Sequence, residues 1–168
     1  LPICPSSDSL DLGATTVTGQ RLSDTTEGSG SYTTGSTNTA TGLPLSIRET
    51  PQSVSVITTQ RMRDQGITEL TDVVRQTPGL RFNQPGNSGS DNNSIYSRGF
   101  SVENYQIDGL QLLDSNYSSP AQTNDMVLYD RVEIIRGATG LTNGVGTPGA
   151  TLNMIRKRPT FTPQSSIT

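Results

Sequence analysis

The sequence predicts an α+β domain, and three observations carry this prediction. Several segments, most clearly 131–136, alternate apolar and polar residues with the period of two that β-strands have. Two short stretches between 59 and 77 carry helix start and stop residues, and the second places apolar residues three and four positions apart. Long runs of Ser, Thr, Asn, Gly and Pro connect these segments, as loops do. At 168 residues the chain forms one domain preceded by a flexible leader.

The leader is predicted over residues 1–42, which hold few apolar residues and many Ser, Thr and Gly. Within it, residues 14–18 form a small β-prone island. Such a segment can add as a strand to the edge of a partner's sheet, although its composition alone favours one more piece of linker. Ordered structure is expected to begin near Leu43.

The first ordered elements are a strand and two short helices. Residues 53–58 alternate as a strand, and Thr59 is placed to cap a helix over 60–65 that Gly66 ends in the left-handed conformation. Thr68 is placed to cap the second helix. The stripe of that helix which faces the core is formed by Leu70, Val73, Val74 and Thr77.

The next elements are strands. Residues 94–100 form one predicted strand, and 105–112 form a hairpin whose Asp108-Gly109 pair favours a type I′ turn. A short helical turn is expected around 125–129.

A glycine-rich crossover joins the last two predicted strands, 131–136 and 151–155. Gly144, Gly146 and Gly149 in it match G-x-G-x-x-G. That motif binds a nucleotide only when it directly follows a strand, opens a helix and precedes an acidic residue by about 20 positions. None of these conditions holds here, and no P-loop lysine is present, so the sequence argues against a nucleotide site.

Composition excludes further classes of function. The net charge of -3 and a pI near 4.8 argue against nucleic-acid binding, which needs a basic surface. With no His and a single Cys, the chain lacks His-based catalytic triads and most zinc sites. We therefore expect no enzyme, no metal site and no cofactor. No apolar run approaches the 18 residues of a transmembrane helix.

Six segments together resemble, in order and spacing, the plug domain of TonB-dependent outer-membrane siderophore receptors. They are 48–57, 77–79, 97–100, 105–109, 131–137 and 152–159. The resemblance covers residues 43–159 and is strongest to the ferripyoverdine (pseudobactin) and ferric-hydroxamate branch. It implies a small plug with a mixed four-stranded sheet, short helices and long polar loops. It also implies that residues 160–168 begin a 22-stranded barrel that surrounds the plug.

The resemblance implies a function and a location as well. The plug would gate a receptor that binds and imports a ferric siderophore across the outer membrane of a Gram-negative bacterium, with the N-terminus in the periplasm. Iron would arrive as cargo. The TonB box would be Ala14, Thr15, Thr16, Val17 and Thr18, which would pair with TonB, the partner of ExbB and ExbD. Residues 10–13 resemble the exit of a signalling domain, which would add an anti-sigma regulator to the partners.

Two polar loops, 83–93 and 111–117, are predicted to form the siderophore-binding face, because an aromatic residue among amides suits a large polar chelate with apolar edges. The alternative is that both loops are solvent-exposed spacers. The candidate binding residues are Gln84, Asn87, Asn104, Gln111, Asp114, Asn116 and Tyr117.

Two arginines that precede glycines, Arg98 and Arg136, are each predicted to lie in a strand. The resemblance implies that they reach glutamates of the barrel wall and hold the plug in place. Glu133 belongs to the same group, because it could pair with one of them inside the plug. The alternative function, from another class, is a free-standing ligand-binding module that uses the Asn/Tyr-rich loops.

Overall fold

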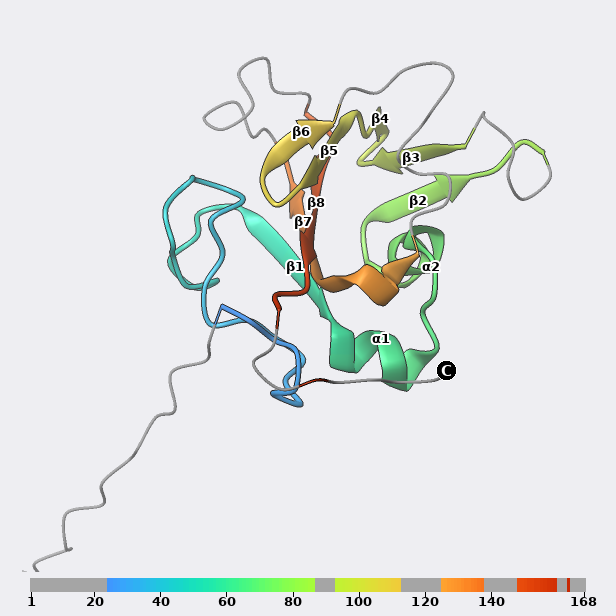
Figure 1. Cartoon of the computed structure of the whole chain (residues 1–168). Coiled ribbons are helices and arrows are strands. Elements are labelled where there is room, and N and C mark those ends of the chain that lie inside the picture. The colour runs from blue at the N-terminus through green and yellow to red at the C-terminus, as the bar shows by residue number, and fades with distance from the viewer. Residues whose placement is uncertain (1–23, 87–92, 113–124, 138–147, 160–162, 164–168) are drawn as a thin grey trace, which may run out of the picture.

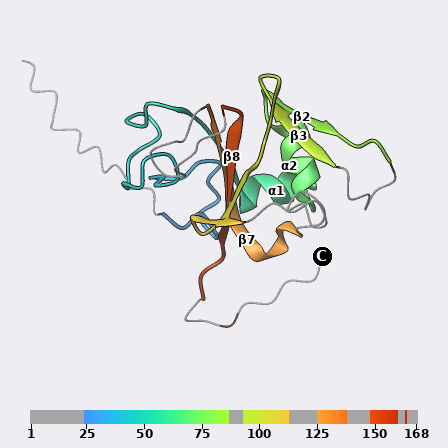
Figure 2. The same ribbon diagram turned by 90° about the horizontal axis from the view of Figure 1, so that it is seen from above.

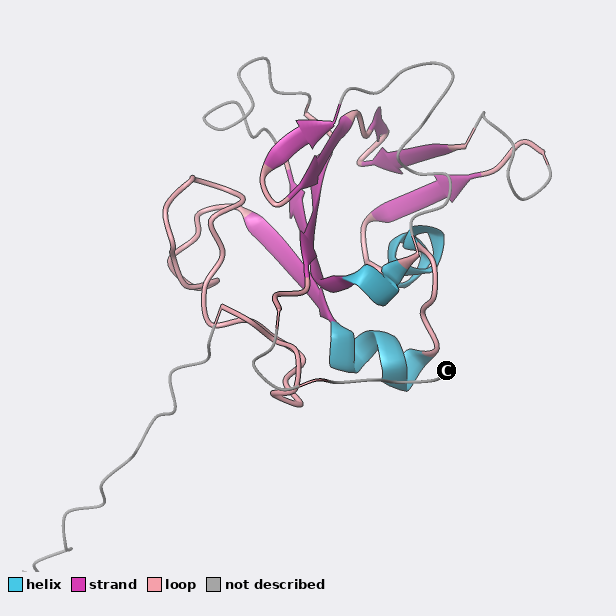
Figure 3. Ribbon diagram, viewed as in Figure 1, coloured by secondary structure: helices cyan, strands magenta, loops and turns pink. Residues whose placement is uncertain are grey.

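The computed structural model describes residues 24–86, 93–112, 125–137, 148–159 and 163. In these ranges the chain forms eight strands, two α-helices and one 3-10 helix (Figures 1 and 3). In chain order they are β1 Ser53–Thr58, α1 Thr59–Gln65, α2 Leu70–Gln76, β2 Leu80–Asn83, β3 Ser94–Ser97, β4 Phe100–Ser101, β5 Asn104–Ile107, β6 Leu110–Leu112, η1 Met126–Leu128, β7 Tyr129–Arg136 and β8 Ala150–Arg156.

The main sheet is mixed, which confirms the predicted α+β class. Its strand order is β1-β7-β8-β5-β6, and β5 runs parallel to β8 while the other pairs are antiparallel. It has five strands where four were expected, because the short β6 adds to its edge. A second, three-stranded sheet consists of β2, β3 and β4.

The helix ends follow the predicted chemistry with shifts of one residue. The N-cap of α1 is Thr58 rather than Thr59, and its hydroxyl accepts a hydrogen bond from the Arg61 N–H at 3.4 Å. Gly66 ends α1 at φ 63°, as predicted. The N-cap of α2 is Glu69 rather than Thr68.

Two turns have paired positive φ angles. Asp108 (φ 51°) and Gly109 (φ 82°) join β5 to β6, which confirms the predicted type I′ hairpin. Arg98 (φ 53°) and Gly99 (φ 88°) do the same between β3 and β4. The prediction of one continuous strand over 94–100 is therefore wrong, because the chain reverses at Arg98.

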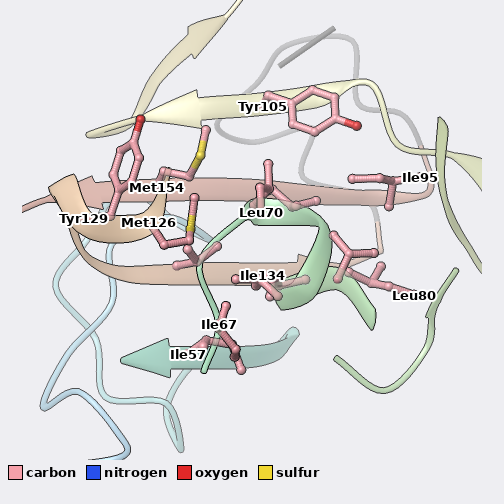
Figure 4. Close-up of a cluster of buried hydrophobic side chains, with 14 of the residues drawn as sticks. Ile57, Ile67, Leu70, Leu80, Ile95, Tyr105, Met126, Tyr129, Ile134 and Met154 are labelled. Atoms are coloured by element: carbon pink, nitrogen blue, oxygen red, sulfur yellow. The ribbon is translucent and has the colours of Figure 1, made fainter. Parts of the chain in front are cut away.

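The hydrophobic core lies between one face of the main sheet and the helices (Figure 4). Val132 and Ile134 of β7 and Leu152 and Met154 of β8 all point into it and are fully buried. The predicted stripe of α2 is confirmed, because Leu70, Val73, Val74 and Thr77 are each at most 2% exposed.

The opposite face of the sheet is covered by residues 24–45, which we call the strap. Figures 1 and 2 show this blue-to-cyan segment beside β1, β7 and β8, across the sheet from α1 and α2. Thr26, Thr34, Thr37, Thr39 and Ala40 of the strap are buried. The expected flexible leader is thus wrong for residues 24–42, which pack on the sheet through polar contacts; residues 1–23 lie outside the described residues.

Candidate functional site

The strap meets the sheet at three charged residues of β7 that are almost completely buried. Asp130 is 2% exposed, Arg131 6% and Glu133 0%. The Arg131 guanidinium donates from Nε to Glu133 Oε1 at 2.8 Å and from a terminal nitrogen to Asp130 Oδ2 at 3.0 Å. One cation therefore bridges two buried carboxylates, a grouping that we call the charge cluster.

Asp130 is the anchor for the beginning of the strap. Its carboxylate accepts from the backbone N–H groups of Thr26, at 3.0 Å, and of Glu27, at 2.5 Å. The Thr26 hydroxyl donates to the same carboxylate and lies equally close, at 3.1 Å, to the Asp130 carbonyl. The register of β7 against β8 shifts between Tyr129 and Arg131, and such a bulge lets neighbouring residues of a strand reach one partner.

Glu133 anchors the second half of the strap. Its Oε2 accepts from the hydroxyls of Thr37 and Thr39, each at 2.5 Å. Asn153 of β8 donates to the Thr39 hydroxyl at 2.8 Å. The Glu133 carboxylate thus receives three donors, which is what a charge needs in order to be buried without a large desolvation penalty.

Sequence reasoning missed the charge cluster. The signal was present in Asp130, Arg131 and Glu133, three charged residues within four positions of a strand expected to be central. Charges in such a strand are buried and must be paired. The sequence did not show which segment would donate hydrogen bonds to these charges. In the structure the threonine-rich strap does so.

Arg98 and Arg136, the two arginines expected to hold the plug in the barrel, lie in different environments. Arg136, the last residue of β7, donates to the hydroxyls of Ser53 and Ser55 at 2.8 and 2.9 Å and to the Pro78 carbonyl. Arg98 is exposed in the β3–β4 turn and not in a strand as predicted. The alternative that Glu133 pairs with Arg98 or Arg136 is wrong, because Glu133 pairs with Arg131. A barrel contact of either arginine stays a prediction.

Arg98 borders a hollow of about 830 Å³ on the three-stranded sheet. Arg81 and Tyr96, which face each other across β2 and β3, also line it. Among the described residues that line this hollow, none is acidic. The surface therefore favours an anionic or carboxylate-bearing partner.

The candidate siderophore residues are only partly within the described ranges. Gln84 directly follows β2 and is half-buried. Asn104 is buried in β5, where its side-chain oxygen accepts from the Gln111 amide of β6 at 3.3 Å. Asn87, Asp114, Asn116 and Tyr117 lie outside the described residues, as does the candidate TonB box, Ala14 to Thr18.

The turn of the β5–β6 hairpin carries the exposed ion pair between Asp108 and Arg156, with 2.5 Å between Oδ2 and Nε. Burial alone would raise the pKa of the Asp108 carboxyl. The hydrogen bonds from the Arg156 backbone N–H and guanidinium outweigh burial and hold that pKa below its usual value.

Gly149, which directly precedes β8, lies close to β4 of the second sheet. A Cβ atom at this position would lie 2.8 Å from the Ser101 carbonyl oxygen, which belongs to β4. We expect Gly149→Ala to lower the free energy of unfolding by about 1–3 kcal/mol, the usual cost of overpacking. Chemical denaturation measures this loss. A variant as stable as the parent would show that β4 moves away freely.

The described residues contain no group of three or more Asp, Glu, Cys or His side chains arranged to hold a metal ion. Neither helix in this part of the chain has the length and apolar character that a membrane crossing needs.

The fold and the motifs define a class of protein. The family described as TonB-dependent Receptor Plug Domain matches residues 46–151, and this chain belongs to that family. It is 49% identical over 166 residues to the ferric-pyoverdine BN7/BN8 receptor of Pseudomonas putida, covering 97% of this chain and 20% of that protein. It is also 49% identical to the ferripyoverdine receptor of Pseudomonas aeruginosa over 154 residues, with coverages of 90% and 18%.

A solved structure agrees with these sequence relatives. The crystal structure of the outer-membrane ferripyoverdine receptor of Pseudomonas aeruginosa, bound to ferripyoverdine, superposes with a TM-score of 0.73 at 48% identity, covering 82% of this chain and 18% of that one. The chain therefore spans about a fifth of the length of the curated relatives it matches.

Proposed function

We propose that this chain is the plug of an outer-membrane receptor that imports a ferric siderophore of the pyoverdine class. The observation that carries the proposal is the likeness to ferripyoverdine receptors, which extends over nine-tenths or more of the chain at 49% identity. The plug would sit inside the receptor's own C-terminal barrel and gate it without catalysing a reaction. Iron would pass as cargo, so the domain would need no cofactor of its own.

The partners follow from the same proposal. TonB, with ExbB and ExbD, would engage residues 14–18 in the periplasm by strand addition. Arg98 and Arg136 would reach carboxylates of the barrel wall, since an Arg side chain binds a carboxylate through two parallel hydrogen bonds. Arg81, which lines the same hollow as Arg98, adds a second cation on that side. A signalling domain ahead of residue 14 would connect the receptor to an anti-sigma regulator.

The siderophore face is tested in the full-length receptor. We expect Gln84→Ala and Tyr117→Ala together to weaken ferric-siderophore binding by about 10-fold or more, because an aromatic contact and an amide hydrogen bond are lost. Equilibrium titration with the iron-loaded siderophore gives the affinity. Gln65→Ala, at the exposed end of α1, is the matched control and should bind as the parent does.

Unchanged affinity in the double variant would show that these loops are spacers. Binding of no ferric siderophore by the parent receptor would contradict the proposed function itself.

A further inference from the structure

The turn of the β5–β6 hairpin is bound to β8 by its backbone and by a side chain. The Asp108 N–H donates to the Met154 carbonyl at 3.0 Å. The Gly109 N–H donates to the Asn153 side-chain oxygen at 3.1 Å. The Asp108 carboxylate accepts from the Arg156 backbone N–H at 2.9 Å and from its guanidinium Nε at 2.5 Å. We call these four hydrogen bonds the turn clamp.

The acceptor that Asn153 offers to the turn has a fixed orientation. Asn153 is 1% exposed, and its Nδ2 donates to the Thr39 hydroxyl at 2.8 Å. Its oxygen is therefore the group that faces Gly109. A buried amide with both ends hydrogen-bonded keeps its rotamer, so the turn meets a rigid partner on β8.

The strand β6 has few other attachments. It is three residues long and lies at the edge of the main sheet, where β5 is its sheet neighbour (Figure 1). Leu110 is 74% exposed, and only the partly buried Leu112 packs against the hydrophobic core. Because a short edge strand with little buried apolar surface is held weakly, the turn clamp contributes much of what fixes the position of β6.

Gln111 is the candidate siderophore-binding residue that β6 carries. It is exposed, and its amide donates to the buried side chain of Asn104 at 3.3 Å. It follows Gly109 by two positions, so a tilt of the turn displaces it as well. The turn clamp at one end of β6 therefore sets where Gln111 lies.

We propose that Asp108 is a positioning residue for siderophore binding: through Arg156 it holds the β5–β6 hairpin so that Gln111 is presented in its binding orientation. The identity of the ligand rests on the proposed function, whereas the turn clamp does not. A loosened hairpin leaves only a fraction of the receptor molecules competent to bind. That fraction lowers the association rate, while the siderophore, once bound, dissociates as it does from the parent.

The experiment measures association and dissociation rates of a ferric pyoverdine on the full-length receptor by surface plasmon resonance. Asp108→Gly removes the carboxylate, and glycine keeps the left-handed conformation of the turn. With two hydrogen bonds lost, it should lower the association rate about 10-fold and leave the dissociation rate within about 2-fold of the parent. Asp108→Asn retains an acceptor for the Arg156 N–H and should recover most of the association rate.

Arg156→Gln tests whether Asp108 acts through Arg156. Alone it should slow association about 3-fold, because the guanidinium is lost and the backbone N–H remains. Added to Asp108→Gly it should have no further effect, since its partner is already absent. Independent, multiplying effects of the two changes would show that Asp108 contacts the siderophore itself and would overturn the positioning role.

The matched control is the exposed ion pair of Asp72 and Arg75 on α2, whose side chains are 33% and 57% exposed. The side chains of the clamp pair are 34% and 64% exposed. Asp72→Asn with Arg75→Gln should leave both rates unchanged.

Hydrogen exchange of the same receptors separates a loosened hairpin from a misfolded plug. In Asp108→Gly the Gly109 amide should exchange about 10-fold faster than in the parent, while the amides of β7 keep their parent rates. An unchanged association rate, or a faster dissociation with unchanged association, would overturn the proposal. A parent receptor that binds no ferric siderophore would instead contradict the proposed function and, with it, this role of Asp108.

Discussion

Arg131→Met should lower the free energy of unfolding of this chain by about 3–5 kcal/mol, the usual cost of breaking a buried ion pair from one side. Arg131 is 6% exposed and bridges Asp130 and Glu133, so its removal leaves two buried carboxylates without their shared cation. Methionine has similar length and no charge, and so it fills the space without replacing the pairing. Urea denaturation followed by circular dichroism gives the difference.

Arg81→Met is the matched control, because Arg81 is exposed and makes no ion pair in the described part of the chain. Its effect should stay within about 0.5 kcal/mol, as for other surface substitutions. A loss below about 1 kcal/mol in Arg131→Met would contradict the idea that the charge cluster is shielded from water by the strap.

The elements that could be predicted from the sequence are those whose cause is local. Apolar alternation located β7 and β8, and it assigned Val132 and Leu152 correctly to the core. The Asp108-Gly109 pair located a turn that requires two positive φ angles. Gly66 marked the end of α1 for the same reason.

The strap could not be predicted, because its order arises from contacts distant in the sequence. Thr26 is held by Asp130, 104 positions away, and Thr39 by Asn153, 114 positions away. A threonine that donates a hydrogen bond to a buried carboxylate has no apolar period, so its segment has the composition of a linker. The β3–β4 reversal was missed because Arg98, and not a glycine, takes the first left-handed position.

The candidate site, too, could be predicted from the sequence only in part. Motif resemblance identified the family, which depends on many residues along 46–151. Sequence reasoning did not give the pairing of Glu133, because it considered Arg98 and Arg136 as partners and not Arg131. Only the side of β7 on which each side chain lies distinguishes them: Arg131 and Glu133 share the strap side, whereas Arg136 reaches Ser53 and Ser55 of β1.

Thr16→Pro should abolish siderophore-dependent iron uptake by the full-length receptor, with a loss of at least about 100-fold, while siderophore affinity stays unchanged. Residues 14–18 are proposed to pair with TonB as an added strand, in which backbone hydrogen bonds supply most of the affinity. Proline removes the donor at position 16 and fixes φ near −65°, so the strand loses both a hydrogen bond and its extended geometry.

Thr16→Ala is the control that separates backbone from side chain, because alanine keeps the N–H group and should transport as the parent does. Uptake assays with iron-55-labelled siderophore, beside a binding assay on the same cells, give both quantities. Normal uptake by Thr16→Pro would place the TonB contact outside residues 14–18, and equal losses in both variants would assign the contact to the side chain instead of the backbone.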